Sequence, residues 1–477
     1  MYTKTNTFLE GSILRSLITL AVPIVLANIL QAGYQLTDAF WVGRLGSAAV
    51  AAVSVSFPIM FLSIALGAGL AIAGSTLIAQ YVGAKNHRMV DHVAAQTLLM
   101  VLIVSVVLGI IGYTLTPTLL HLMGVAPDVY ASALGFMHIS FIGLVSSFSF
   151  VMFQSILRGI GETTLPIYIV LGTVLLNFIL DPLFIFGGGP VPALGVMGAA
   201  LATLGTQTIA AFIGLAVLFG GKYGIHLSWA NFVPDFDFIK RTFFLGLPAS
   251  IEQSARALGL TVMTFLVASF GTLTVAAYGV GGNVLQVVLI PAMGLSMAIS
   301  ILVGQNIGAG NIERAARIGR LGAWLSFWIL SGVGVVVFIF APSLVAFFIP
   351  EDPAVIALGA TFLRTIALAW GCMGVQLALN GVLRASGSMV VTMVLTLVSQ
   401  WGIQFPLAYV LSKHTVLGAS GIWWAFPIAN ILSVLITLGV YAKGDWKNKR
   451  LVGSEEMLTE RVSEEIFTEE TYTSRQT

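Results

Sequence analysis

Three acidic residues lie within long apolar stretches of the sequence: Asp38, Asp181 and Glu252. If these stretches cross a bilayer, a charge near its centre costs roughly 2.5–3.5 kcal/mol or more, so each acid is a functional candidate by default. A carboxyl group in an apolar cavity also has a raised pKa, which brings proton uptake into range near neutral pH. The acids could therefore exchange protons, although carboxylates serve Na⁺ coupling as well.

Polar neighbours accompany the two aspartates. Tyr34 precedes Asp38 by four residues and Asn177 precedes Asp181 by four, so each pair shares one helix face. At 1.5 Å per residue from the cytoplasmic end, both aspartates reach the outer half of the bilayer, which predicts one coupled site. The alternative is structural: each aspartate caps a helix end or pairs with an arginine, and Arg44 is the available partner of Asp38.

Glu252 follows Pro248 in the apolar stretch 240–268, near its expected cytoplasmic end. Arg256 stands four residues later, a spacing that predicts a mutual salt bridge. The alternative is that Glu252 forms a second proton or substrate contact. Pro23, in the first apolar stretch, could supply helix flexibility because proline removes a backbone hydrogen bond.

The composition indicates a membrane protein. Of 477 residues, 57% are apolar and 9% are charged, whereas soluble globular proteins carry roughly 25% charged residues. This excludes a soluble enzyme and a disordered chain. A net charge of +2 with few basic clusters argues against nucleic-acid binding, and the single cysteine, Cys372, can form no internal disulfide.

Twelve apolar stretches are long enough to cross a bilayer, which takes about 20 residues. They lie near residues 15–42, 49–80, 90–116, 130–157, 163–186, 195–219, 240–268, 274–304, 316–347, 355–382, 389–411 and 418–442. If the N-terminus is cytoplasmic, the outside loops hold Arg44 and Lys413, and the inside loops hold a large excess of basic residues. This bias predicts a multi-pass protein of the cytoplasmic (inner) membrane with both termini in the cytoplasm.

The two halves repeat at an offset of 225 residues. Residues 80–86 read QYVGAKN and residues 305–311 read QNIGAGN. Six helices per half keep one orientation, so the repeat is parallel and predicts two lobes around a central transport cavity. Asp38 aligns with Met263, which is not acidic. A purely architectural acid should recur in both lobes, so this asymmetry favours a function in the first lobe.

We expect an N-lobe at residues 1–220, a cytoplasmic interlobe loop at 221–239, a C-lobe at 240–445 and an acidic cytoplasmic tail at 446–477. We assign the tail no chemistry. The sequence has no G-x-x-x-x-G-K-[ST] loop for ATP. Scattered histidines and one cysteine predict no metal site, and no cofactor is expected. Transport would therefore be passive or driven by an ion gradient.

The sequence resembles the MATE (multidrug and toxic compound extrusion) family over about residues 10–445, most closely the prokaryotic DNA-damage-inducible branch. The matching segments are Leu20–Pro23, Asp38–Gly43, Leu157–Gly161, Asn177–Pro182, Gly198–Thr203 and the two Q-x-x-G-A-x-N loops. The resemblance implies an all-α integral membrane fold with twelve transmembrane helices. These would form two six-helix lobes related by pseudo-two-fold symmetry, in a V shape with a central cavity.

The resemblance also implies residue roles. In this branch the positions matching Asp38 and Asp181 carry the coupling cation, with Tyr34, Asn177 and Thr203 as the matching neighbours. Bending of the first helix near the position of Pro23 has been proposed for the family.

Two positions depart from the family pattern. Members often have Tyr where Phe136 stands and Asn where Gln154 stands, so a polar network through them is not supported. They remain candidate substrate or second-proton positions together with Glu252. The norfloxacin-type branch uses C-lobe acids, and Glu252 is the acid that this C-lobe offers.

These observations predict a monomeric, proton-coupled exporter of amphipathic, often cationic, drug-like compounds. One alternative is a Na⁺-coupled drug antiporter. Another is a lipid-linked oligosaccharide flippase of the same superfamily, which would more often have fourteen spans and a cavity rich in Arg or Lys. An integral-membrane enzyme would need a nucleophile with its base, a metal cluster or a D-D-x-x-D-like motif, and the sequence shows none of them.

Overall fold

The computed structural model describes residues 7–188, 190–350 and 352–452. The helices are α2 (Ile13–Gly43), α3 (Ser47–Gly83), α4 (His87–Leu122), α5 (Pro127–Gly159), α6 (Thr164–Phe186), α7 (Val196–Phe219), η1 (Trp229–Phe232), α8 (Phe236–Ala268), α9 (Thr272–Gly308), α10 (Ile312–Phe348), α11 (Pro353–Ala367), α12 (Trp370–Ala385), α13 (Met389–Leu397), η2 (Val398–Gln404), α14 (Phe405–Lys413), α15 (Ala419–Lys443) and η3 (Asp445–Asn448). Within these ranges the only β pairing is an isolated bridge between Gly188 and Val191. The described part of the chain is therefore all-α, as the sequence predicts.

Each of the twelve expected stretches is a helix or a run of consecutive helices. Within the described residues, ten spans are long and apolar enough to cross a membrane on their own, and α11 and α12 form an eleventh that bends by 50°. The twelfth is α8, a 33-residue helix in which Glu252 and Arg256 interrupt the apolar pattern. Twelve crossings bring the two described ends of the chain to the same end of the molecule.

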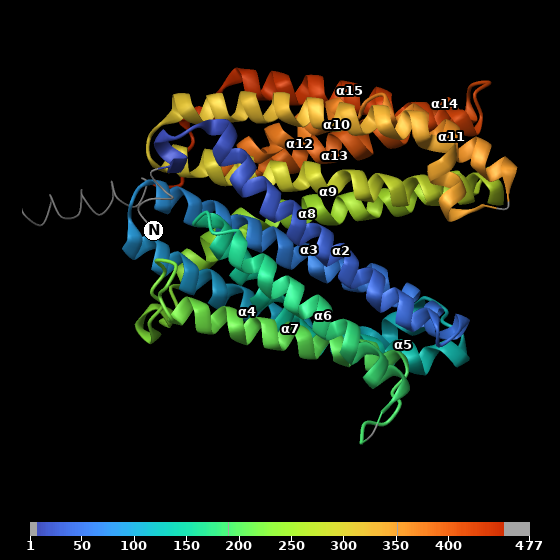
Figure 1. The fold of residues 1–477 in the computed structure, drawn as a ribbon, viewed down its shortest axis with the longest axis horizontal. Coiled ribbons are helices and arrows are strands. Elements are labelled where there is room, and N and C mark those ends of the chain that lie inside the picture. Colours follow the sequence, from blue (N-terminus) through green and yellow to red (C-terminus); the bar gives the residue numbers. More distant parts are fainter. Residues whose placement is uncertain (1–6, 189, 351, 453–477) are drawn as a thin grey trace, which may run out of the picture.

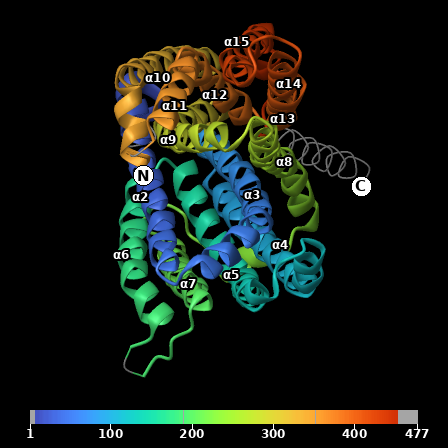
Figure 2. The same cartoon turned by 90° about the vertical axis from the view of Figure 1, so that its right-hand side faces the viewer.

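The helices form two lobes, α2–α7 and α8–α15 (Figures 1 and 2). Helix α2 packs against α6 of its own lobe and against α9 of the other lobe. Helix α8, its counterpart in the repeat, packs against α13 and α3 in the same way. This exchange of neighbours is what a pseudo-two-fold axis between the lobes requires.

The lobes are in close contact along the C-terminal halves of α3 and α9. The Ser250 hydroxyl donates to the Leu66 carbonyl at 2.9 Å, which joins α8 to α3. On α9, a Cβ at Gly294 would lie 2.5 Å from Cγ2 of Val25 in α2. We call this contact zone, which ends at Gln80 and Gln305, the seam. From the seam the two lobes diverge toward the right of Figure 1, which gives the molecule its V shape.

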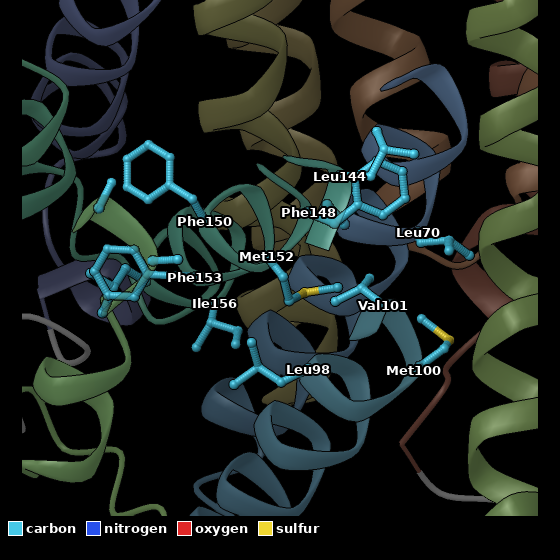
Figure 3. Close-up of a cluster of buried hydrophobic side chains, with 14 of the residues drawn as sticks. Leu70, Leu98, Met100, Val101, Leu144, Phe148, Phe150, Met152, Phe153 and Ile156 are labelled. Carbon is cyan, nitrogen blue, oxygen red and sulfur yellow. The ribbon is translucent and has the colours of Figure 1, made fainter. Parts of the chain in front are cut away.

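Small residues bring the N-lobe helices together around a sulfur- and aromatic-rich core (Figure 3). Gly67 of α3 lies against the ring of Phe148, and a Cβ at Gly74 would be 3.1 Å from the Met152 sulfur. Both partners project from α5. Glycine permits this approach because it presents no side chain, which is a common basis for helix association in membranes.

The same device sets the spacing of α6 and α7. A Cβ at Gly198 would meet the Phe184 carbonyl and lie 2.7 Å from the Ile185 nitrogen, so the two backbones touch. The contact places Asp181 of α6 and Thr203 of α7 in adjacent turns of the hairpin. Gly205 lies farther along α7 and has no neighbouring atom within 4 Å of its Cβ position.

We predict that Gly198→Ala destabilises the protein by about 1–3 kcal/mol, because the added methyl group must displace backbone and cannot relax into space. The measurement is thermal unfolding in detergent. Gly205→Ala on the same helix is the matched control and should leave the melting temperature near that of the wild type. Equal melting temperatures for the two variants would contradict the close packing of α6 on α7.

Candidate functional site

The N-lobe contains a polar cluster built by three helices. Helix α2 contributes Tyr34 and Asp38, and α6 contributes Asn177 and Asp181, each pair one helical turn apart. Helix α7 contributes Thr203. Asn177 and Asp181 are 0% exposed, and Tyr34 is 4% exposed. The structure thus brings together all five residues that the sequence assigned to cation coupling.

The two carboxyl groups are close neighbours. Asp38 and Asp181 approach within direct hydrogen-bonding range of each other. The Asn177 amide donates from Nδ2 to Asp181 Oδ1 at 3.1 Å, and the Thr203 hydroxyl donates to Asp38 Oδ2 at 3.4 Å. Each aspartate therefore has one oxygen held by a neutral donor, and the pair shares one small space.

Three buried oxygens of this cluster lack a hydrogen-bond donor among the described residues: Asp38 Oδ1, Asp181 Oδ2 and Asn177 Oδ1. Burying a charge without a partner is costly, and two adjacent carboxylates also repel each other. A proton shared by the pair, or a small cation bound by its oxygens, would relieve both costs. The arrangement is therefore suited to taking up and releasing a positive charge.

Arg44 does not neutralise the pair. Its guanidinium lies over the rings of Phe40 and Trp41. The guanidinium carbon, Cζ, is 4.6 Å from the Phe40 ring centroid and 5.2 Å from the Trp41 ring centroid. In the described part of the chain, no ion pair joins Arg44 to Asp38. The structure therefore does not support the alternative in which Asp38 forms a salt bridge with Arg44.

Thr206 is a member of the cluster that the sequence analysis missed. The Tyr34 hydroxyl and the Thr206 hydroxyl are 2.6 Å apart, and Thr206 is fully buried. Thr206 follows Thr203 by three residues, so both hydroxyls project from the same face of α7. That spacing is the signal that could have identified it.

The other predicted N-lobe positions lie outside this cluster. Phe136 and Gln154 are half-buried residues of α5, and the contacts described for the two aspartates include neither of them. Pro23 lies inside α2, which continues as one helix from Ile13 to Gly43. A role for Pro23 as a hinge stays a prediction.

Glu252 occupies a different electrostatic setting in the C-lobe. Its Oε1 accepts from Arg256 at 2.8 Å, from Arg384 at 2.5 Å and from Thr396 at 3.2 Å. The predicted Glu252–Arg256 salt bridge is present, and Arg384 of α12 is a second partner that the sequence analysis did not name. Two arginines around one 1%-exposed carboxylate leave the cluster with a net positive charge.

A small cavity of about 10 Å³, room for about one water molecule, lies in the C-lobe near this cluster. It is lined by Gly259 and Met263 of α8, Tyr278 of α9, and Gln404 and Trp401 of the π-helical segment η2, among others. The lining is mostly aromatic and amide and contains no acid. Short π-helical turns within α-helices frequently occur at functional sites.

A comparison with known protein families matches one segment in each half of the chain. A family model described as MatE matches residues 23–183 and 248–410. "Probable multidrug resistance protein YoeA" of Bacillus subtilis (strain 168) is 32% identical over 449 residues, which cover 93% of this chain and 96% of that protein. "Probable multidrug resistance protein NorM" of Thermotoga maritima is 28% identical over 445 residues, covering 92% and 95%.

Solved structures share the fold. An outward-facing multidrug resistance MATE family transporter of the MOP superfamily superposes with a TM-score of 0.86 at 24% identity, covering 93% of this chain and 98% of that one. A MATE transporter of Vibrio cholerae superposes with a TM-score of 0.84 at 22% identity, covering 92% and 98%. At these identities the likeness concerns the fold alone.

We predict that Glu252→Gln destabilises the protein by about 3–5 kcal/mol, since removing one member of a buried ion cluster leaves its partners uncompensated. Thermal unfolding in detergent measures the loss. Glu313→Gln, at an exposed position in the first turn of α10, is the control and should have little effect. A wild-type melting temperature for Glu252→Gln would show that the cluster contributes nothing to stability.

Proposed function

The chain belongs to the MatE family and is a multi-pass secondary transporter for multidrug efflux, and we propose that it exchanges its substrates for protons carried by Asp38 and Asp181. The observation that carries the proposal is the carboxyl pair of the N-lobe, Asp181 fully buried and Asp38 half-buried, which has unpartnered oxygens and no ion pair among the described residues. A transporter that exchanges a cationic substrate for protons needs a site that can bind either the substrate or a proton. Such a site must not contain a permanent positive charge.

We propose that substrate and proton compete for this pair. With both aspartates protonated, the cluster is neutral and holds a cationic compound weakly. With the protons lost, the negative charge attracts the compound. Protonation from the outer side therefore releases the substrate outward, and return of the protons to the cytoplasm restores the binding state. Asn177 and Thr203 hold the carboxyl groups in position through neutral hydrogen bonds, and Tyr34 bonds to Thr206 beside them.

The proton is favoured over Na⁺ by the electrostatics of the C-lobe. The acid available there, Glu252, is already bound by Arg256 and Arg384, and that positive surplus opposes a further cation. In the N-lobe, a single shared proton is enough to satisfy two facing carboxyl groups. We therefore assign the coupling to the N-lobe and to H⁺.

We propose that amphipathic, often cationic, drug-like compounds are the substrates and that the transporter works as a monomer. The names of the similar proteins of Bacillus subtilis and Thermotoga maritima, both called probable multidrug resistance proteins, support the drug-like class. The acids of the N-lobe would select the positive charge.

We place the seam at the cytoplasmic side of the inner membrane, with both termini in the cytoplasm. The helix junctions beside the seam, before α4 and α10, carry Lys85, Arg88, Arg314 and Arg317. At the opposite end, the corresponding junctions carry Arg44 and Lys413. An excess of basic residues marks cytoplasmic loops. The lobes then meet on the cytoplasmic side, which leaves the N-lobe acids on the outward side.

The test is efflux of a fluorescent cationic dye from proteoliposomes under an imposed pH gradient. We expect the wild type to transport, and Asp38→Asn and Asp181→Asn each to lower the initial rate about tenfold or more, because each removes a proton carrier. Asp128→Asn, at an exposed position in the first turn of α5, is the matched control and should retain the wild-type rate.

A separate arm replaces the pH gradient with a Na⁺ gradient at constant pH. The proposal expects no dye movement in that arm. Transport driven by Na⁺ alone, or wild-type pH-driven rates in both aspartate variants, would overturn it. Melting temperatures of the variants in detergent separate a loss of coupling from a loss of folding.

A further inference from the structure

The repeated Q-x-x-G motif forms a reciprocal crossing at the seam. Gln80 and Gly83 stand near the end of α3, and Gln305 and Gly308 stand at the equivalent place in α9. A Cβ at Gly83 would collide with the Gln305 carbonyl, and a Cβ at Gly308 would collide with the Gln80 carbonyl. Glycine at both positions therefore lets the ends of the two helices touch backbone to backbone.

The two glutamine side chains cross between the lobes. Gln80 of the N-lobe donates from Nε2 to the carbonyl of Ala385 at the end of α12, at 2.7 Å. Gln305 of the C-lobe donates to the carbonyl of Gly159 at the end of α5, at 3.1 Å. Both glutamines are 0% exposed. Separation of the lobes at this end must break both bonds.

The C-terminal segment breaks this symmetry. The Leu451 N–H donates to Gln80 Oε1 at 2.8 Å, while the equivalent oxygen of Gln305 has no donor among the described residues. The Arg450 guanidinium donates to the Gly308 carbonyl at 2.5 Å. Residues 450–452 therefore hold the polar ends of both halves of the motif.

The same segment is anchored by packing on both lobes. Val452 is 0% exposed within the N-lobe core. The Leu451 side chain covers Gly387 of the C-lobe, where a Cβ would lie 2.7 Å from its Cδ2. Upstream, Trp446 is 2% exposed in the core that α9, α10 and α12 share with the first turns of α2. When the lobes move apart, a segment bound to both must lose its contacts with at least one of them.

We propose that Arg450, Leu451 and Val452 form a strap that locks the seam and stabilises the cytoplasm-closed state of the transporter. Contacts made in only one conformation shift the population toward that conformation. The strap must leave at least one lobe before the cytoplasmic side opens, so it sets how often the substrate site faces the cytoplasm. The inference rests on the proposed function only in assuming that the seam opens, and it is independent of the coupling ion.

The experiment measures opening of the seam directly. In a Cys372→Ser background, Ala79→Cys places a thiol at a 1%-exposed seam position, where the Ala79 Cβ is 3.1 Å from the Cβ position of Gly304. Inside-out vesicles are treated with a membrane-impermeant maleimide, and the labelling rate is measured. One chain ends after Lys449 and lacks the strap, and its matched control ends after Val452 and lacks only the residues beyond it.

We expect the chain that ends after Lys449 to label about tenfold faster than the chain that ends after Val452, since it loses contacts made only in the closed state. The control should label at the full-length rate. Equal rates for the two truncated chains, or faster labelling of both, would overturn the proposal. Because no ion gradient is applied, neither result bears on the proton-coupling proposal, which the proteoliposome experiment tests separately.

A point variant guards against a folding defect in the truncated chain. Leu451→Pro removes both the N–H that donates to Gln80 Oε1 and the leucine side chain that covers Gly387, and it keeps Arg450 and Val452. It should label several-fold faster than the full-length protein while eluting as the same species in size-exclusion chromatography. An unchanged labelling rate in folded Leu451→Pro protein contradicts the strap even if the truncated chain cannot be purified.

Discussion

A buried carboxyl group must be neutralised, and the two lobes of this protein meet that requirement in opposite ways. In the C-lobe, Glu252 is surrounded by Arg256 and Arg384, so its charge is fixed and structural. In the N-lobe, Asp38 and Asp181 face each other with neutral donors at one oxygen each and nothing positive nearby in the described chain. A proton or a small cation would neutralise the N-lobe pair, and the proposed ion coupling rests on this property.

The two lobes have the same helix arrangement, although only the N-lobe carries the aspartate pair. Each lobe repeats the same helix order, and α2 and α8 exchange neighbours across the pseudo-two-fold axis. The acids lie on α2 and α6, close to α7, because Gly198 allows the backbones of α6 and α7 to touch. The lobes meet at the seam and diverge beyond it, so the carboxyl pair belongs to the part of the N-lobe that is free of the other lobe.

The sequence predicted the helices well, because twelve apolar stretches have few alternatives in a bilayer. It also singled out Asp38 and Asp181, since an acid in an apolar stretch is conspicuous, and their neighbours at a spacing of four; the structure brings these residues together, and their coupling role stays a prediction. It missed contacts between residues far apart in the chain, such as Arg384 with Glu252, Thr206 with Tyr34, and the strap with Gln80. The break between α11 and α12 and the π-helical turn η2 depend on packing that local composition does not record.

The central claim is that a substrate and a proton exclude each other at the N-lobe carboxyl pair. The most direct measurement is the number of protons released when a cationic substrate binds to the purified protein in weakly buffered detergent. The account predicts release of about one proton or more per substrate bound near neutral pH, and none when both aspartates are replaced by asparagine. Saturating binding to the wild type without any proton release would contradict it.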